Sequence, residues 1–315
     1  MAVVDDIVTI TLNPTIDLST SVDRVVPVQK LRCKGLKRDP GGGGINVARV
    51  VRRLGAEVTA IYTMGGPIGD LLRQLVEQER IRSRPVRIAA QTRENVTVTE
   101  DDTSEQYRFV LEGPRIDEAE WRECLAAIET LEPFPKYLVA SGSLAPGVPD
   151  DFYLRVARFA AARGARFILD ASGAALKAAL DGDIFLIKPN QRELADLVGR
   201  PLEDERAWIE GCRWLIERRG VSTVALTLGH QGAMLVGRDG AWRAPALPIK
   251  PVSAVGAGDS FLGGMVFSLA SGSGLEDAFR CGIASGSAAL LTGGTELSRR
   301  EDTERLLADV TLHAI

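Results

Sequence analysis

The chain has 315 residues, of which 45% are hydrophobic and 25% charged, as in a globular protein able to bury a large core. Its formal net charge of −4 gives no reason to expect nucleic acid or an anionic membrane as a partner, and four scattered cysteines with two histidines argue against a zinc site or a disulfide framework. The first residues lack the features of a signal peptide, and apolar runs such as 7–12 are too short to cross a membrane, so we expect a cytoplasmic protein.

Short β-branched runs alternate with amphipathic helical segments along most of the chain, a pattern typical of a mostly parallel sheet covered by helices. We expect core strands at residues 7–13, 58–64, 137–141, 167–170, 184–187 and 223–228. We expect helices at residues 45–54, 69–78, 117–130, 150–163, 191–198, 206–219, 258–270 and 275–291. The prediction is therefore an α/β fold.

Two segments, 15–38 and 92–111, break this alternation because both are extended and partly polar without a helix between their halves. The second contains alternating residues up to Glu100, a turn at Asp101 and Asp102, and another extended run, which indicates a hairpin. Two such insertions could pair into a small second sheet that serves as a lid or a dimer surface. Ordinary surface hairpins fit the pattern about equally well.

The strongest local signal is at residues 255–260, which read VGAGDS just before a predicted helix. Small residues at 256–258 let the backbone approach a ligand, and the first N–H groups of the helix can bind an anion such as phosphate. Asp259 would repel a resting phosphate, but it makes sense as a base that takes a proton from an attacking hydroxyl. An aspartate N-cap after a glycine turn is the alternative, and it is favoured if this motif is considered alone.

The second signal is a glycine run, because residues 40–49 read PGGGGINVAR ahead of a predicted helix. Four glycines leave no side chains between the backbone and a ligand, and Asn46 can donate a hydrogen bond to a hydroxyl. A flexible hinge is the alternative, and a hinge beside a lid would itself be functional.

The third signal is at residues 188–193, which read KPNQRE after a predicted buried strand. Asn190 and Glu193 share one face of a helix start and could hold a hydrated Mg²⁺ through water. The same spacing is nearly that of a capping box, with Asn190 as the N-cap. The pattern alone favours neither interpretation.

Three further charged residues are candidates for substrate binding. Asp17 follows a predicted strand and could accept hydrogen bonds from sugar hydroxyls, whereas Lys30 and Arg93 lie in the two insertions and could clamp a substrate phosphate. The default for each is a solvated surface charge. The sequence has no GxxxxGK[ST] loop, no GxGxxG after a strand and no GxSxG, which argues against P-loop, dinucleotide and serine-hydrolase sites.

In this order and spacing the motifs resemble the PfkB (ribokinase-like) carbohydrate kinase family. The likeness covers almost the whole chain, and its segments are 11–17, 41–46, 141–143, 170, 188–193, 227–229 and 256–259. It implies a three-layer ribokinase-like α/β domain over residues 1–315, with a mostly parallel central sheet. It also implies a small β-sheet lid formed by insertions at about 15–38 and 92–111, and a homodimer formed through the lids.

The resemblance implies a role for each matching residue. Asp259 is implied as the base, with an anion hole made by Gly256, Ala257 and Gly258. The residues implied to contact the sugar phosphate are Asp17, Lys30, Gly42, Gly43, Asn46, Arg93 and Ser143. Those implied to contact ATP are Lys188, Asn190, Thr227, Gly229 and Gly232. Glu193 is implied to act on Mg²⁺ through water, with Asp170 as a weaker candidate.

Members of the family often bind a monovalent cation such as K⁺ beside the anion hole, which here implies a contact around Ser253 and Val255. The family commonly has threonine where this chain has Ala254, so the chain departs from the pattern at that cation or nucleotide contact.

Residues 30–33, 41–46 and 105–110 are most similar to the members that phosphorylate fructose-6-phosphate. A lysine within the glycine run, common in 1-phosphofructokinases and tagatose-6-phosphate kinases, is absent here. The resemblance therefore implies Mg-ATP-dependent phosphorylation of the C1 hydroxyl to give fructose-1,6-bisphosphate. Tagatose-6-phosphate kinase or 1-phosphofructokinase activity is the alternative within the family, and a non-catalytic sugar- or nucleotide-binding sensor is the alternative outside it.

Overall fold

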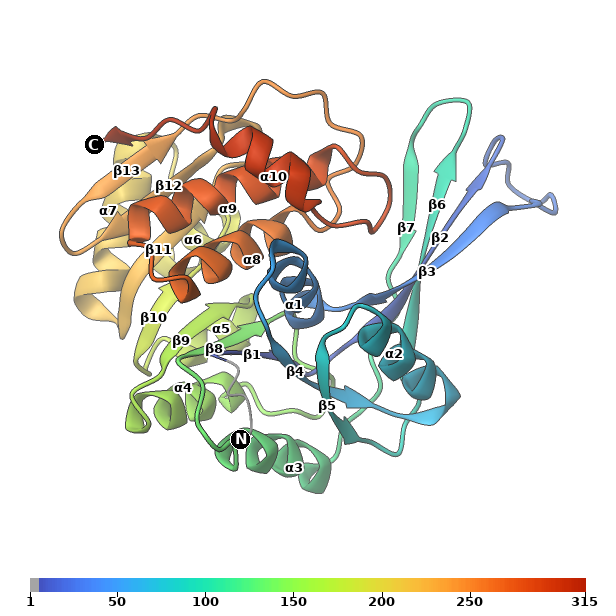
Figure 1. Ribbon diagram of the computed structural model, residues 1–315, viewed down its shortest axis with the longest axis horizontal. Coiled ribbons are helices and arrows are strands. Elements are labelled where there is room, and N and C mark those ends of the chain that lie inside the picture. Colours follow the sequence, from blue (N-terminus) through green and yellow to red (C-terminus); the bar gives the residue numbers. More distant parts are fainter. Residues whose placement is uncertain (1–5) are drawn as a thin grey trace.

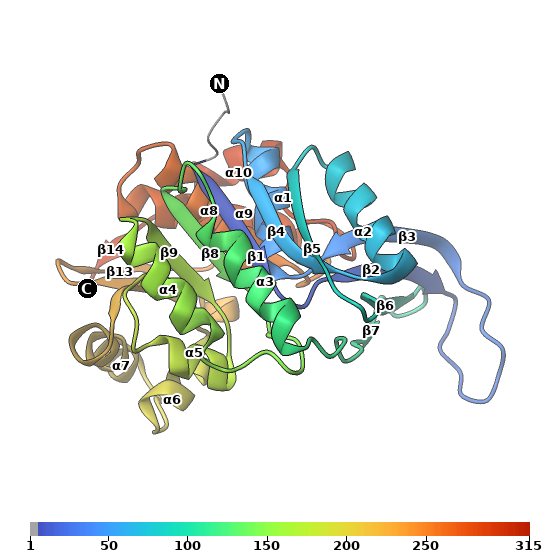
Figure 2. The same cartoon turned by 90° about the horizontal axis from the view of Figure 1, so that it is seen from below.

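In the computed structural model, which describes residues 6–315, a ten-stranded sheet lies between two layers of helices (Figure 1; Figure 2). Its strand order is β14 (His313–Ala314), β13 (Ala241–Ala244), β12 (Ala233–Gly237), β11 (Val221–Thr227), β10 (Ile184–Ile187), β9 (Arg166–Asp170), β8 (Tyr137–Ser141), β1 (Ile7–Thr11), β4 (Thr59–Met64) and β5 (Arg82–Arg87). The strands from β11 to β5 are parallel, and β12 to β14 pair antiparallel at one edge. The predicted mostly parallel sheet is confirmed.

The helices divide between the two faces of this sheet (Figure 2). One face packs against α1 (Gly43–Leu54), α2 (Gly66–Gln78), α8 (Ala257–Ala270), α9 (Leu275–Leu290) and α10 (Arg300–Leu307). The other packs against α3 (Glu118–Glu129), α4 (Phe152–Ala162), α5 (Gly173–Ala179), α6 (Gln191–Val198) and α7 (Glu205–Arg218). This is the three-layer α/β arrangement that the sequence predicts.

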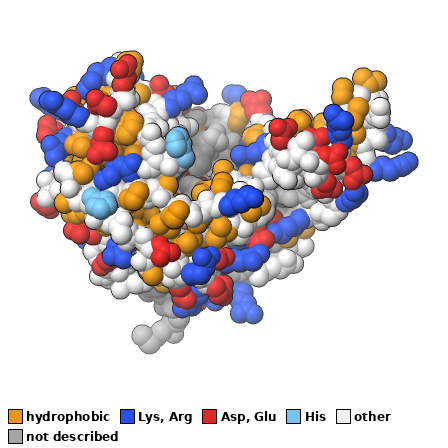
Figure 3. All heavy atoms as spheres, turned by 90° about the horizontal axis from the view of Figure 1, so that it is seen from above, with side chains coloured by type: hydrophobic (Ala, Val, Ile, Leu, Met, Phe, Trp, Pro, Cys, Tyr) orange, Lys and Arg blue, Asp and Glu red, His pale blue; other side chains and the backbone are white. Residues whose placement is uncertain are grey.

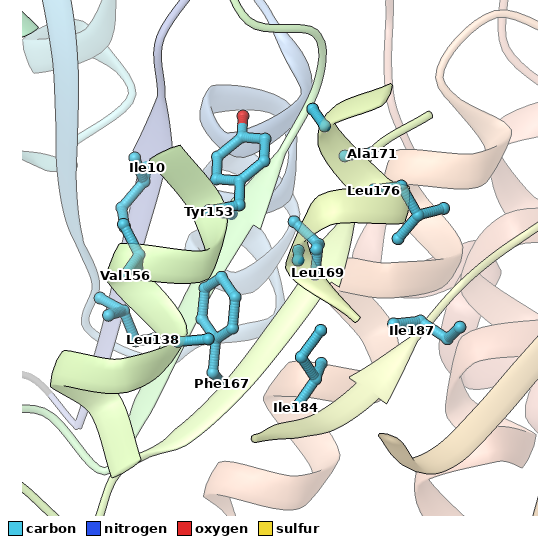
Figure 4. Packing of buried hydrophobic residues seen from close by; sticks show 14 of the residues in the cluster. Ile10, Leu138, Tyr153, Val156, Phe167, Leu169, Ala171, Leu176, Ile184 and Ile187 are labelled. Atoms are coloured by element: carbon cyan, nitrogen blue, oxygen red, sulfur yellow. The ribbon is translucent and has the colours of Figure 1, made fainter. Parts of the chain in front are cut away.

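Each central strand sends alternate side chains into the two helical layers, which is why these strands read as almost continuous apolar runs. In β8, Leu138 packs with the layer of α3–α7, and Val139 packs with the layer of α1 and α8. Figure 4 shows the first of these cores, where Phe167 of β9 lies near Tyr153 and Val156 of α4. These side chains expose at most 1% of their surface, and each such burial stabilises the fold by about 1.5–3 kcal/mol.

A second sheet of four strands is built from the two insertions and projects from the body (Figure 1). Its order is β3 (Lys34–Gly41), β2 (Thr15–Val22), β6 (Arg93–Glu100) and β7 (Gln106–Phe109). The two insertions meet where β2 pairs parallel with β6, from Thr15 opposite Arg93 to Val22 opposite Glu100. The prediction that they form one small sheet is confirmed, and the chain turns at Asp101 as expected.

The second sheet has a polar face and an apolar face, because successive residues of a strand point to opposite sides. In register across the sheet, Leu18 lies beside Val96 and Val96 beside Phe109, so these side chains share the apolar face. Asp17 lies beside Asn95 on the opposite, polar face.

Several elements were not predicted from the sequence. These are β5, β12, β13, β14, α5 and α10. The edge strand β5 reads RSRPVR, and its charges and proline suit an edge but hide the alternation that identifies a strand. Helix α10 reads REDTERLL, with only Thr303 and Leu306 buried, so its apolar stripe is too narrow to detect.

Candidate active site

Most of the residues predicted for catalysis and binding gather at one edge of the central sheet. Parallel strands end at the same edge, and Ser141, Asp170 and Thr227 are the last residues of β8, β9 and β11. Helices α1 and α8 begin beside these strand ends. Figure 3 shows that the surface is hollowed between the body and the second sheet.

Asp259, at the start of α8, is held by a residue of α1 that follows the glycine run. Its carboxylate Oδ2 accepts a hydrogen bond of 2.8 Å from the amide Nδ2 of Asn46. The N-cap of α8 is Gly256, which has a left-handed φ of 74° and makes no side-chain cap. The alternative interpretation of Asp259 as a helix N-cap is therefore wrong, because its carboxylate faces another element instead of its own helix.

Burial and nearby charges set the pKa of Asp259. Burial, reinforced by the negative charge of Asp170, raises the pKa of Asp259 to about 6, although the hydrogen bond from Asn46 and the ammonium of Lys188 oppose this rise. A carboxyl group with a pKa near 6 is ionised at neutral pH and can take a proton there. This is the property that a general base needs.

Lys188 supplies a positive charge beside the start of α8. Its ammonium Nζ lies 3.2 Å from Asp170 Oδ1, and a Cβ on Gly258 would lie 3.3 Å from the same Nζ. Burial alone would lower the pKa of Lys188, but Asp170 and Asp259 raise it, so the side chain stays charged. The helix start and this ammonium together provide an electropositive cradle for an anion.

The glycine run is packed too closely for side chains. A Cβ on Gly41 would lie 2.2 Å from Asp17 Oδ2, and one on Gly43 would lie 2.3 Å from Ser141 Oγ. Gly42 has a φ of 106°, which residues with a side chain rarely adopt. Helix α1 starts inside the run, at Gly43, and not at Ile45 as predicted, so the glycines bring the helix start against the end of β8.

The polar face of the second sheet turns Asp17 and Arg93 toward this edge. Asp17 Oδ1 accepts a 3.0 Å hydrogen bond from Asn95, and burial raises the pKa of Asp17 against the pull of nearby arginines. Arg93 donates to the backbone carbonyls of Leu111 and Asn13, at 2.8 Å and 3.0 Å. Its Nε is buried without a hydrogen-bond partner.

Ser143 and Asn13 continue this surface beneath the second sheet. The amide Nδ2 of Asn13 donates to Ser143 Oγ at 3.2 Å, while its buried Oδ1 has no partner. The hydroxyl of Tyr153, from the core of α4, donates to the carbonyl of Gly142 at 3.1 Å and holds this loop in place.

A cavity of about 880 Å³ opens on the other side of the start of α8. Four of the residues predicted for ATP line it: Asn190, Thr227, Gly229 and Gly232. Its apolar wall includes Leu247, Phe261 and Ile283, and it reaches Ala257 and Gly258. The volume is that of a site for a ligand of nucleotide size.

The motif around Asn190 forms a complete capping box. Asn190 Oδ1 accepts from the backbone N–H of Glu193, and Glu193 Oε2 accepts from that of Asn190, both at 2.9 Å. This confirms the capping interpretation and holds the Glu193 carboxylate beside Asn190, which lines the cavity. Within residues 6–315 no group of three or more His, Cys, Asp or Glu side chains forms a ready-made metal cage.

Ser253 and Val255 form a point where the second sheet touches the body. Ser253 Oγ donates to Gln106 Oε1 of β7 at 3.2 Å and accepts from the backbone N–H of Val255 at 3.3 Å. The carbonyl oxygen of Gly294 lies 3.5 Å from the same hydroxyl. The loop that enters the anion hole is thus held by β7.

Lys30 is the predicted site residue that the structure does not bring to this edge. It lies exposed in the loop between β2 and β3. That loop is at the far end of the second sheet (Figure 1). Three residues missed by sequence reasoning are close to the others: Arg49, Gln106 and Arg108. Arg108 shares the polar face with Asp17 and lowers its pKa. The alternation of β7 could have identified Arg108.

The family model for pfkB family carbohydrate kinases matches residues 5–302. The chain belongs to the pfkB family of carbohydrate kinases. ATP-dependent 6-phosphofructokinase isozyme 2 of Mycobacterium tuberculosis is 43% identical over 95% of this chain and 88% of its own length. The protein of the same name from Escherichia coli is 39% identical over 96% of this chain and 98% of its own. The 1-phosphofructokinase of Bacillus subtilis is 31% identical.

Among solved structures, Escherichia coli phosphofructokinase-2 in complex with substrates and products matches this pfkB family member with a TM-score of 0.91, at 39% identity over 96% of this chain and 98% of that one. The family and the ribokinase-like fold predicted from the motifs are therefore confirmed. Within the described residues, no helix is long and apolar enough to cross a membrane.

Proposed function

We propose that the protein is an ATP-dependent 6-phosphofructokinase that phosphorylates the C1 hydroxyl of fructose-6-phosphate to give fructose-1,6-bisphosphate. The observation that carries the proposal is the position of Asp259. Its half-buried carboxylate lies at the start of α8, between the 880 Å³ cavity and the polar face of the second sheet. Relatives named 6-phosphofructokinase are 39–43% identical, and the 1-phosphofructokinase is less similar, which favours this acceptor.

The geometry supports an in-line transfer. ATP lies in the cavity with its γ-phosphoryl group at the backbone N–H groups of residues 256–258. The sugar lies under the second sheet with its C1 hydroxyl toward Asp259, which accepts the hydroxyl proton as the oxygen attacks phosphorus. Lys188 and the helix start stabilise the charge on the transferring group and on the departing ADP.

The sugar phosphate is held by charges of the second sheet. Arg93, with its unpaired Nε, and Arg108 lie on the face that carries Asp17, whose carboxylate suits sugar hydroxyls. The glycine run brings Asn46 and backbone groups close to the same acceptor. Lys30 lies too far from these residues to bind the same sugar phosphate within one chain. We therefore expect it to reach the acceptor site of a partner subunit.

Two carboxylates near Lys188 could serve a metal ion. Glu193 and Asp170 suit Mg²⁺ that arrives with ATP and keeps most of its water, and this ion would neutralise phosphate charge. Ser253, Val255 and the carbonyl of Gly294 are oxygen-rich neighbours of the anion hole and suit a monovalent cation such as K⁺. The Escherichia coli relative has been solved in complex with potassium.

The apolar face of the second sheet supports a homodimer. Leu36 and Phe109 are 53–55% exposed, which is costly for an isolated chain. Pairing of these faces would form the dimer, with the second sheets acting as lids over each site. We place the enzyme in the cytoplasm, where its substrates are.

The test is the initial rate of ADP production with Mg-ATP and a panel of acceptors: fructose-6-phosphate, tagatose-6-phosphate, fructose-1-phosphate, fructose and ribose. We expect the highest kcat/KM with fructose-6-phosphate. A preference for another phosphorylated sugar would keep the mechanism and overturn the substrate. No turnover with any sugar would favour a non-catalytic sensor.

A further inference from the structure

A fully buried arginine contacts Asn46, the residue whose amide donates to Asp259. Arg49 follows Asn46 by three residues on α1 and exposes 1% of its surface. A buried guanidinium is costly unless its N–H groups are paired. Its Nε donates to Glu79 Oε1 at 2.8 Å, and its Nη2 donates to Asp39 Oδ1 of β3 at 3.2 Å.

The remaining nitrogen of Arg49 faces the residue that holds the base. Nη1 donates to the carbonyl of Pro40 at 3.1 Å and to the side-chain Oδ1 of Asn46 at 3.5 Å. The second contact is long, but a guanidinium only donates, so a flipped amide would bring two sets of N–H groups against each other. Asn46 therefore keeps Oδ1 toward Arg49 and Nδ2 toward Asp259.

We propose that Arg49 is a positioning residue for phosphoryl transfer, which fixes the amide of Asn46 so that it donates to the carboxylate of Asp259. Through Asp39, Arg49 also connects Asn46 and Asp259 to the C-terminal end of β3, where the second sheet leaves the body. The inference rests on the proposed role of Asp259 as the base, and it assigns a task to a residue that touches neither the substrate nor the reacting atoms.

The surrounding charges define what Arg49 does. Those that face Asp259 are Asp170 of β9, Lys188 after β10 and Asp17 of β2. Those around Arg49 are Asp39, Glu79 and Asp17, whose pKa the charge of Arg49 lowers. Beyond them are Lys37, whose Nζ lies 3.4 Å from Asp39, and Arg53, which donates to Glu79 at 2.8 Å. None of these neighbours donates to Asp259 in place of Asn46, so the hydrogen bond that favours the ionised base depends on one correctly oriented amide.

The experiment compares the pH dependence of kcat in the wild type, Arg49→Gln, Arg49→Lys and Arg53→Gln. In both Arg49 variants we expect the acidic limb to move about one pH unit upward, because the ionised base loses part of its hydrogen bonding. Arg49→Lys keeps a positive charge between Asp39 and Glu79 but cannot also orient Asn46, so it separates charge from geometry. Arg53→Gln, which loses the contacts of Arg53 with Glu79 and with the carbonyl of Leu297 but none with Asn46, should keep the wild-type limb.

Two outcomes would overturn the proposal. One is an unchanged acidic limb in both Arg49 variants, with activity reduced only by the fraction of molecules that is unfolded in the assay. Urea denaturation of each variant gives that fraction. The other is a wild-type limb in Arg49→Lys, which would mean that charge alone suffices. If Arg49→Gln does not fold, Arg49→Lys decides the question.

A measurement without substrates separates this proposal from the proposed function. The ¹³C carboxyl signal of Asp259 can be titrated in the same variants, and we expect the same upward shift of its pKa. A wild type that phosphorylates a different sugar, or none, would contradict the proposed function, while this titration would still confirm or overturn the role of Arg49.

Discussion

The two halves of the site are built very differently. The body presents Asp259, Lys188 and the anion hole on elements that are packed on both sides, and Asp259 is fixed by a hydrogen bond of 2.8 Å to a second helix. The second sheet presents Asp17 and Arg93 on four strands that project from the body (Figure 1). It touches the body near the site through a few polar contacts, such as that between Gln106 and Ser253.

This difference indicates that the body carries out phosphoryl transfer and that the second sheet recognises the sugar. Groups that must meet a transition state gain from elements whose positions are fixed by the core. A sheet with an exposed apolar face and few contacts has low local stability, so it can move over a substrate or pair with another copy. Changes in the body should therefore reduce kcat, and changes in the second sheet should act on sugar affinity and assembly.

The largest effect is expected for Asp259→Asn. Loss of a general base should lower kcat by about 10²–10⁴-fold while ATP still binds, as measured by calorimetry. The variant should also be more stable to urea near pH 7. Burial raises the pKa of Asp259 from 3.8 to about 6, so its ionised form destabilises the fold progressively as pH rises through that window, on the order of 2 kcal/mol in total. Full activity would refute the assignment.

Arg93→Met tests the second sheet alone. Loss of a charged donor to the sugar phosphate should raise the KM for fructose-6-phosphate by about 10–100-fold, with kcat and the KM for ATP changed much less. Arg87→Met is the control, because Arg87 is an exposed arginine that pairs with Asp70. A large fall in kcat with unchanged KM would place Arg93 in the chemistry of the transfer. It would contradict the assignment of substrate recognition to the second sheet.

The sequence predicted the body half of the site far better than the connections between the halves. Residues 256–259 and 188–193 are contiguous motifs, and local backbone geometry decides what they do. Arg49 has no such signal, because it occupies an ordinary helical position whose importance comes from Asp39 and Glu79, brought to it by other elements. Gln106 likewise matters only because β7 lies against residue 253.

Phe109→Glu tests the apolar face. Phe109 is 55% exposed beside Val96, and a carboxylate there would be desolvated in a dimer, so we expect the dimer Kd to rise by at least about tenfold. Sedimentation velocity measures this change. The matched control is Trp214→Glu, a similarly exposed apolar residue on α7 of the body, which should leave the sedimentation coefficient unchanged. A monomeric wild type would refute the proposed dimer.

The smallest effect is expected where the two halves touch. Gln106→Ala removes the acceptor of Ser253 Oγ, and a neutral hydrogen bond contributes about 0.5–1.5 kcal/mol, so kcat/KM should fall only about two- to tenfold. A double-mutant cycle with Ser253→Ala isolates this contact, since each single variant should cost nearly as much as the pair. Additive losses would mean that β7 and the anion-hole loop act independently. Non-additive losses of kcat/KM that grow at low potassium concentration would instead show that the second sheet acts on the body. The contact would act through residue 253, at the edge of the anion hole.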